Sequence, residues 1–190
     1  MGLEDLYQEI ILDHYKKPRH PGRLEGAQVE VHHYNPVCGD ELLLGLRLDG
    51  DRVPAVAVDG KGCSISQAAA SVMTEQVLGR ALPEALDQAE AFRRMMHGEG
   101  EPDEELLGDG IAFKGVARYP VRVKCALLGW MAFKDAAARA ATGQGPGETV
   151  YGEEQDETAV RAARGDTGGP GAQVAEGDSP RMEQGAEGTE

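Results

Sequence analysis

The chain of 190 residues has few cysteines, few basic residues and no long apolar run. Its three cysteines are an odd number, and no apolar stretch is long enough to cross a bilayer. Its first residues lack the basic and apolar regions of a secretory signal peptide. These absences predict a cytoplasmic protein without a membrane span, in which clustered thiols serve metal binding or catalysis more often than disulfides.

Positive charge is also scarce, because 33 acidic residues face 19 basic ones and give a formal net charge of −14. Much of this excess lies in residues 143–190, which hold eleven acidic residues, three arginines and few large apolar side chains. That composition predicts a disordered acidic tail after one domain at residues 1–142. An acidic surface disfavours nucleic acid as a ligand, and the absence of a heptad pattern favours a monomer.

The predicted domain is α+β, with helices packed on one side of a three-stranded antiparallel sheet. Apolar residues at helical spacing predict a first helix that ends before Pro18. Alternating residues predict strands over 28–32, 42–48 and 52–58, and Asp49-Gly50 marks a tight turn between the last two. Further helices are expected over 64–78, over 83–96 and from about 124 to 141, which completes a small two-layer domain.

The first cysteine, Cys38, lies in a turn-rich segment between Pro36 and Gly39, and Asp40 follows two residues later. Residues two apart in an extended segment point to the same side. The thiol of Cys38 and the carboxylate of Asp40 are therefore candidates to face one pocket.

The other two cysteines precede helical runs. Ser64 and Gln67 have the spacing of a capping box, which places Cys63 at a helix N-terminus, and Cys125 is expected at the start of the last helix. Three cations lie near these two cysteines: Lys61, Arg122 and Lys124. Turns, helix starts and cations predict lowered thiol pKa values for the three cysteines, and thiolates bind metals and attack sulfur. A free cysteine is also commonly a small buried apolar residue, so both interpretations remain open.

Three segments carry a specific resemblance when they are taken together. They read Asn-Pro-Val-Cys-Gly-Asp at 35–40, Gly-Lys-Gly-Cys-Ser-Ile-Ser-Gln-Ala at 60–68 and Tyr-Pro-Val-Arg-Val-Lys-Cys-Ala at 119–126. They resemble the cysteine motifs of the IscU/SufU family, the NifU N-terminal-like proteins of iron–sulfur cluster biogenesis, and the similarity covers residues 2–141. Scaffold-type members have a histidine where this chain has Lys124, and residues 93–110 look like the SufU-type insertion. The chain is therefore most similar to the SufU type.

This resemblance implies a site and a function. Cys38, Asp40, Cys63 and Cys125 would hold one zinc ion, and three thiolates with one carboxylate suit tetrahedral zinc. Cys38 would accept persulfide sulfur from a cysteine desulfurase and pass it to the iron–sulfur cluster scaffold complex. The protein would then be a sulfurtransferase partner of the desulfurase rather than a stand-alone enzyme. Arg122 is a candidate to support the anionic sulfur, or else a solvated cation.

Two other functions remain open. The same ligands would suit a scaffold that binds iron and assembles a [2Fe–2S] cluster, although Lys124 argues mildly against it. A structural zinc-binding domain used only for protein contacts is the third hypothesis. The histidines are scattered, and His32 and His33 are expected on opposite faces of a strand, so no histidine pair has the spacing of metal ligands.

Overall fold

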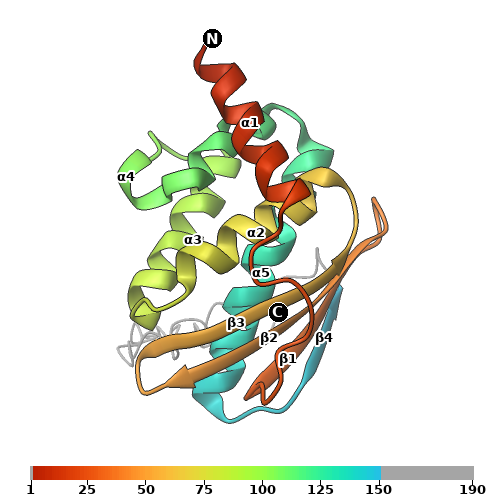
Figure 1. Ribbon diagram of the computed structural model, residues 1–190, viewed down its shortest axis with the longest axis vertical. Helices are drawn as coiled ribbons and strands as arrows, with labels where there is room; N and C mark the ends of the chain where they lie inside the picture. Colours follow the sequence, from red (N-terminus) through yellow and green to blue (C-terminus); the bar gives the residue numbers. More distant parts are fainter. Residues whose placement is uncertain (1, 151–190) are drawn as a thin grey trace, which may run out of the picture.

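The computed structural model describes residues 2–150, and side chains are described for residues 2–147. A sheet forms one layer and the helices form the other (Figure 1), which confirms the predicted α+β class. The strands are β1 (Val29–Asn35), β2 (Asp40–Asp49), β3 (Arg52–Lys61) and β4 (Gly147–Val150). The helices are α1 (Leu3–Lys16), α2 (Ser64–Val77), α3 (Leu82–Met96), α4 (Glu104–Leu107), the 3₁₀ helix η1 (Gly108–Arg118) and α5 (Pro120–Thr142).

Strands β1, β2 and β3 form the predicted antiparallel meander. Leu44 of β2 lies opposite Val31 of β1 and Val58 of β3, and all three side chains are buried. The hairpin between β2 and β3 turns at Gly50, whose φ of 59° is readily adopted by glycine. The side chains that alternate with exposed ones along each strand therefore form one buried face of the meander, as the sequence pattern predicts.

The register of the meander brings two connections to the same end of the sheet. Asn35 at the end of β1 pairs with Asp40 at the start of β2, and Glu41 pairs with Lys61 at the end of β3. The β1–β2 turn and the β3–α2 connection therefore leave the sheet together. Each of these connections carries a cysteine.

The structure adds a fourth strand that the sequence analysis did not predict. Strand β4 pairs parallel to β1, with Val150 opposite Tyr34, and gives the sheet the order β3-β2-β1-β4. A side chain at Gly147 would overlap the guanidinium of Arg139 on α5, so this end of β4 suits glycine. Strand β4 falls within the predicted tail, and residues 151–190 lie outside the described residues.

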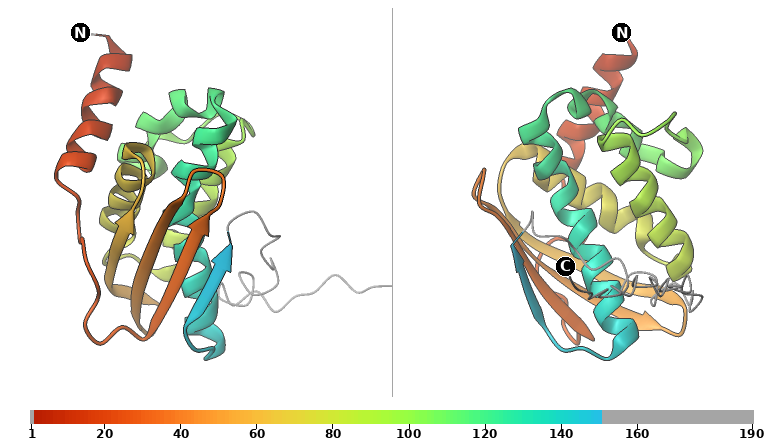
Figure 2. Two further views of the ribbon diagram at one scale, coloured as in Figure 1. Left: turned by 90° about the vertical axis from the view of Figure 1, so that its right-hand side faces the viewer. Right: turned by 180° about the vertical axis from the view of Figure 1, so that it is seen from behind.

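The helices lie on one face of the sheet (Figure 2), as predicted. Helix α5 packs on β1 and β2, and α2 packs against α5 and β3. A Cβ at Gly129 of α5 would lie 3.0 Å from Ala70 of α2, so the two helices cross closely. None of the helices in residues 2–150 combines the length and apolar character needed to span a membrane.

The last helix begins earlier than expected. Helix α5 starts at Pro120 rather than near Lys124, because proline suits the first position of a helix, where no backbone N–H donor is needed. The other helix boundaries agree with the prediction to within two residues. The polar segment after α3 contains α4, whose first turn is capped by the Asp103 carboxylate, followed directly by η1.

Aromatic rings join α3, η1 and α5 in the core. Phe92 stacks on Trp130 with ring centroids 4.7 Å apart, and Phe113 meets Phe92 edge-on at 5.7 Å. All three side chains are fully buried. The helical layer therefore has a tightly packed centre on the helix that also carries Cys125.

We expect Trp130→Ala to lower the free energy of unfolding by about 3–5 kcal/mol, because it removes a buried ring and leaves a cavity beside Phe92. Urea unfolding followed by circular dichroism would measure the change. Leu6→Ala is a suitable control because Leu6 is exposed, and its effect should stay within about 0.5 kcal/mol. Equal effects of the two substitutions would contradict this description of the core.

Candidate metal centre

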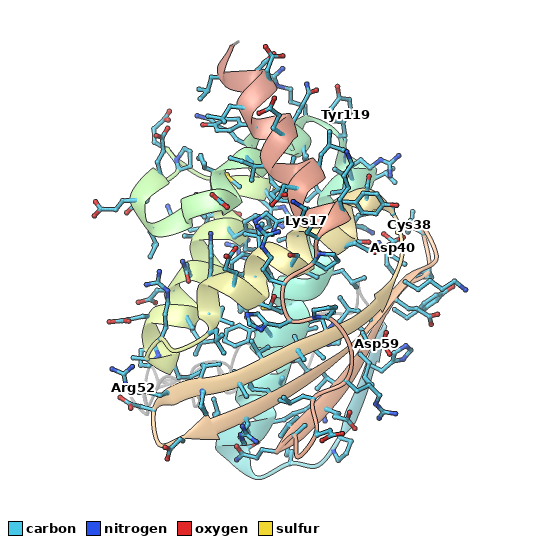
Figure 3. The ribbon with its side chains drawn as sticks, viewed as in Figure 1. Lys17, Cys38, Asp40, Arg52, Asp59 and Tyr119 are labelled. Carbon is cyan, nitrogen blue, oxygen red and sulfur yellow. The ribbon has the colours of Figure 1, made fainter. Side chains whose placement is uncertain are left out.

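The three cysteines and Asp40 come from four segments that meet at one end of the sheet, where Figure 3 labels Cys38 and Asp40. Cys38 lies in the β1–β2 turn and Asp40 is the first residue of β2. Cys63 lies between β3 and α2, and Cys125 lies in the second turn of α5. The antiparallel register and the packing of α2 and α5 on the sheet thus assemble residues that are far apart in the sequence.

Three of the four predicted ligands form a tight group. The ligand atoms of Cys38, Asp40 and Cys125 all lie within 4.8 Å of one another, and the two sulfur atoms are 3.2 Å apart. Asp40 Oδ1 accepts a hydrogen bond from the backbone N–H of Cys63 at 2.9 Å. Asp40 Oδ2 is buried and has no hydrogen-bond partner among the described residues. A buried carboxylate oxygen without a donor is costly unless a cation meets it, so these donors fit a metal ion.

Cys63 borders this group without belonging to it. Its sulfur accepts a hydrogen bond from the backbone N–H of Ser66 at 3.5 Å, so Cys63 itself caps α2. The expected capping box from Ser64 to Gln67 was wrong, because Cys63 has the extended backbone of the capping position and Ser64 is already helical. Gln67 instead donates a hydrogen bond to the Gly62 carbonyl oxygen. The role of Cys63 as a fourth ligand stays a prediction.

Gly62 is required for the close approach of Cys63 and Asp40. A Cβ at Gly62 would lie 2.7 Å from Asp40 Oδ1 and 2.6 Å from Ser66 Oγ. Such distances are too short for any side chain. Because residue 62 is glycine, the backbone between β3 and α2 can lie directly against the Asp40 carboxylate. In the β1–β2 turn, Gly39 takes a φ of 71°, a backbone conformation that glycine adopts readily.

The pKa shifts of Cys38 and Cys125 differ from those predicted. Burial raises the pKa of Cys38, and burial together with Cys38 and Asp40 raises the pKa of Cys125 strongly. The prediction failed for Cys125 because its thiol is buried, and because α5 begins at Pro120, five residues before Cys125, so that the thiol lies away from the helix N-terminus. The metal-free protein therefore holds these two thiols protonated, and a bound cation would favour their thiolates.

Asp40 has the opposite shift. Burial alone would raise its pKa, but the hydrogen bond from the Cys63 N–H and the neighbouring thiols of Cys38 and Cys125 outweigh burial and hold the pKa below the usual value. The site thus keeps one negative charge at neutral pH even before a metal binds.

Arg122 lies outside the tight group. It is exposed in the first turn of α5, and its side chain has no hydrogen bond or ion pair with a described residue. Its suggested role in supporting the anionic sulfur stays a prediction.

Two histidines are buried, and one of them belongs to a second polar cluster that the sequence analysis missed. His14 Nδ1 lies 2.8 Å from Ser71 Oγ, and its Nε2 lies 3.2 Å from Asp109 and 3.6 Å from Glu75. This cluster joins α1, α2 and η1, and Arg19 also lies beside Glu75. Its members come from three separate helices, so no local motif signals it. His33 is likewise buried and pairs with Asp135 of α5 at 3.0 Å.

Together, the fold and the site define an α+β domain with a candidate metal centre of two thiols and a carboxylate at one end of an antiparallel sheet. The sequence pattern of the NifU-like N terminal domain family matches residues 6–126. The chain belongs to this family, as the three cysteine motifs predict.

Two relatives of similar identity are named for different functions, one as a scaffold and one as a sulfurtransferase. The chain is 40% identical over 142 residues to the iron-sulfur cluster assembly scaffold protein IscU of Streptococcus pyogenes serotype M1, which covers 75% of this chain and 89% of that protein. It is 43% identical over 138 residues to the zinc-dependent sulfurtransferase SufU of Bacillus subtilis, which covers 73% of this chain and 93% of that protein. The two identities are too similar to separate the functions.

Solved structures share the fold. The crystal structure of a putative scaffold protein for the SUF system from Fervidobacterium islandicum AW-1 is 41% identical, with a TM-score of 0.65, and the match covers 71% of this chain and 98% of that one. The NifU-like N-terminal protein from Brucella abortus is 25% identical with a TM-score of 0.68, over 74% of this chain and 97% of that one. More than a quarter of this chain thus has no counterpart in either structure.

Proposed function

We propose that this protein accepts persulfide sulfur at Cys38 from a cysteine desulfurase and passes it to the iron–sulfur cluster assembly machinery. One observation carries the proposal: Cys38 is the exposed member of the tight group, whereas Asp40 and Cys125 are buried. An exposed thiol in a turn can meet a partner's sulfur, while the buried ligands stay in place.

A zinc ion held by Cys38, Asp40, Cys63 and Cys125 fits these donors. When bound, zinc stabilises the thiolates without redox chemistry of its own. The unpartnered Asp40 Oδ2 and the adjacent thiols favour such a cation, and the similarity to a zinc-dependent sulfurtransferase agrees.

The transfer needs no external oxidant or reductant. The Cys38 thiolate would attack the terminal sulfur of the donor persulfide, so that a new S–S bond forms at Cys38 while the donor's S–S bond breaks. The donor cysteine leaves as a thiolate, which conserves electrons. Gly39 leaves the turn around Cys38 open, since a Cβ there would meet nothing within 4 Å.

The second candidate is a scaffold that assembles a [2Fe–2S] cluster at the same residues. The 40% identity to a scaffold protein favours it. It requires a stable cluster on the protein, whereas the sulfur acceptor requires added sulfur on Cys38 and a metal that stays colourless.

Mass spectrometry of the full chain after incubation with a cysteine desulfurase and cysteine tests the proposal. We expect the native mass to include one zinc ion and the denatured mass to include an added sulfur atom on the peptide that contains Cys38. Prior removal of zinc with a chelator should lower sulfur acceptance by at least about tenfold, because the thiols are then protonated. A bound iron–sulfur cluster would support the scaffold, and zinc without added sulfur would support the structural domain.

A further inference from the structure

Asn35, the only asparagine of the chain, is hydrogen-bonded to the residues on both sides of Cys38. Its Oδ1 accepts a hydrogen bond from the backbone N–H of Val37 at 3.0 Å, and its backbone oxygen accepts one from the N–H of Gly39 at 2.8 Å. The side-chain contact is an Asx turn, which asparagine forms readily. Because Cys38 lies between the two bonded residues, Asn35 fixes the turn that carries the exposed thiol.

The side chain of Asn35 lies next to the candidate metal centre. Asn35 and Asp40 are directly opposite in the β1–β2 register, at the end of the sheet where Figure 3 labels Asp40, and both side chains are buried. Directly opposed residues of antiparallel strands share one face of the sheet and contact each other. The ligand oxygen of Asp40 lies within 4.8 Å of the sulfur atoms of Cys38 and Cys125. Asn35 therefore borders the tight group from β1.

The amide nitrogen of Asn35 is a buried donor without an acceptor. The Val37 N–H is itself a donor, so the atom that faces it is the amide oxygen, and Nδ2 lies elsewhere. Nδ2 is buried and has no hydrogen-bond partner among the described residues. The same holds for Oδ2 of Asp40 on the opposite strand, and the two atoms do not bond each other. Unpaired buried polar atoms cost free energy, so each of the two indicates a partner of its own.

The two unpaired atoms need partners of opposite charge. Oδ2 of Asp40 suits a cation, whereas Nδ2 of Asn35 needs an acceptor, and an anionic acceptor binds it most strongly. The sulfur of a thiol is a weak acceptor, but a thiolate held by a cation is an anion. A metal-bound cluster therefore supplies both partners at once, the cation for Asp40 and a sulfur for Asn35. Hydrogen bonds of this kind orient the ligands of a metal and strengthen its binding.

We propose that Asn35 is a positioning residue of the cysteine cluster, and that its Nδ2 donates a hydrogen bond to a metal-bound sulfur of the pair Cys38 and Cys125. Its Oδ1 fixes the turn around Cys38, while its Nδ2 stabilises the negative charge on the sulfur pair. Where this role concerns sulfur transfer it rests on the proposed function, because only an acceptor at Cys38 makes the orientation of that thiol matter for the reaction.

Nuclear magnetic resonance of the full chain, loaded with spin-active cadmium in place of zinc, tests the hydrogen bond without any sulfur transfer. Because Asn35 is the only asparagine, isotope labelling of asparagine gives a single side-chain amide, whose signals need no further assignment. We expect one of its two protons to move downfield on metal binding and to show a scalar coupling to cadmium through an N–H···S–Cd contact. Cadmium binding without this coupling, or no cadmium binding, would overturn the proposal.

Asn35→Ser separates the amide donor from the turn. A serine hydroxyl can still accept the Val37 N–H, but no group takes the place of Nδ2. We expect the zinc affinity to fall about tenfold, as measured by competition with a chromogenic chelator. Gln28→Ser is the matched control, because the Gln28 side chain accepts a hydrogen bond from the Leu48 N–H at the opposite end of the sheet. Its affinity should stay within about twofold of the unaltered chain, and equal losses in both variants would contradict the role of Asn35.

Sulfur transfer then distinguishes this role from the proposed function. If Cys38 accepts sulfur, Asn35→Ser should accept it about tenfold more slowly while circular dichroism shows an unchanged fold. A cadmium coupling at Asn35 in a chain that never accepts sulfur would refute only the proposed function. Unchanged zinc affinity and unchanged sulfur acceptance in Asn35→Ser would refute the role of Asn35 and leave the proposed function intact.

Discussion

Cys38→Ser should lower sulfur acceptance from the desulfurase by at least about a hundredfold, because a serine hydroxyl is not a nucleophile toward persulfide sulfur at neutral pH. The change is small in volume and lies at an exposed turn, so the fold should survive. Mass spectrometry would measure the sulfur added, and circular dichroism would report the fold. The exposure of this one thiol makes the substitution decisive.

The same variant separates the three functions. A sulfur acceptor loses transfer but stays folded, whereas a purely structural zinc domain would lose stability and would never carry sulfur on a cysteine. Val37→Ala is a matched control, since it alters the neighbouring exposed side chain and leaves the thiol. Full sulfur acceptance by Cys38→Ser would place the acceptor elsewhere and contradict the proposed function.

Asp40→Asn should weaken zinc binding by at least about a hundredfold. The amide can still accept the hydrogen bond from the Cys63 N–H, but the negative charge at the buried, unpartnered oxygen is lost. Competition with a chromogenic chelator would measure the affinity. Because the pKa of Asp40 lies below its usual value, this charge is present throughout the neutral range, and its loss should weaken zinc binding at every pH from 6 to 8.

Asp59→Asn provides the matched control. Asp59 is an exposed carboxylate of β3 on the same sheet (Figure 3), and its replacement removes an equal charge outside the tight group. We expect its zinc affinity to stay within about twofold of the unaltered chain. Similar losses in the two variants would mean that general charge, rather than coordination by Asp40, governs metal binding.

Local patterns were sufficient for most of the fold. Alternating apolar residues located β2, and the Asp49-Gly50 turn joined it correctly to β3. The start of α5 was missed because Pro120 reads as a helix breaker unless it occupies the first position. Strand β4 was missed because four residues carry no alternation of their own, and their partner β1 lies more than a hundred residues earlier.

The candidate site depended on tertiary structure. The spacing of Cys38 and Asp40 suggested a shared pocket, but only the packing of α5 on the sheet brings Cys125 to them. The direction of the thiol pKa shifts could not be read from neighbouring cations, since it depends on burial. Cys63 contacts Asp40 through its backbone N–H, while its sulfur caps α2. The sequence could not predict this arrangement either.

The pairing of β4 with β1 also bears on self-association. Within the described residues, β4 occupies the hydrogen-bonding side of β1 that would otherwise stay open. At the opposite margin, β3 contains Pro54, which lacks an N–H donor, and residues 20–22 exchange hydrogen bonds with Val58. Within residues 2–150, neither margin offers a long free strand edge to which another polypeptide could add a strand, and this disfavours aggregation through the sheet.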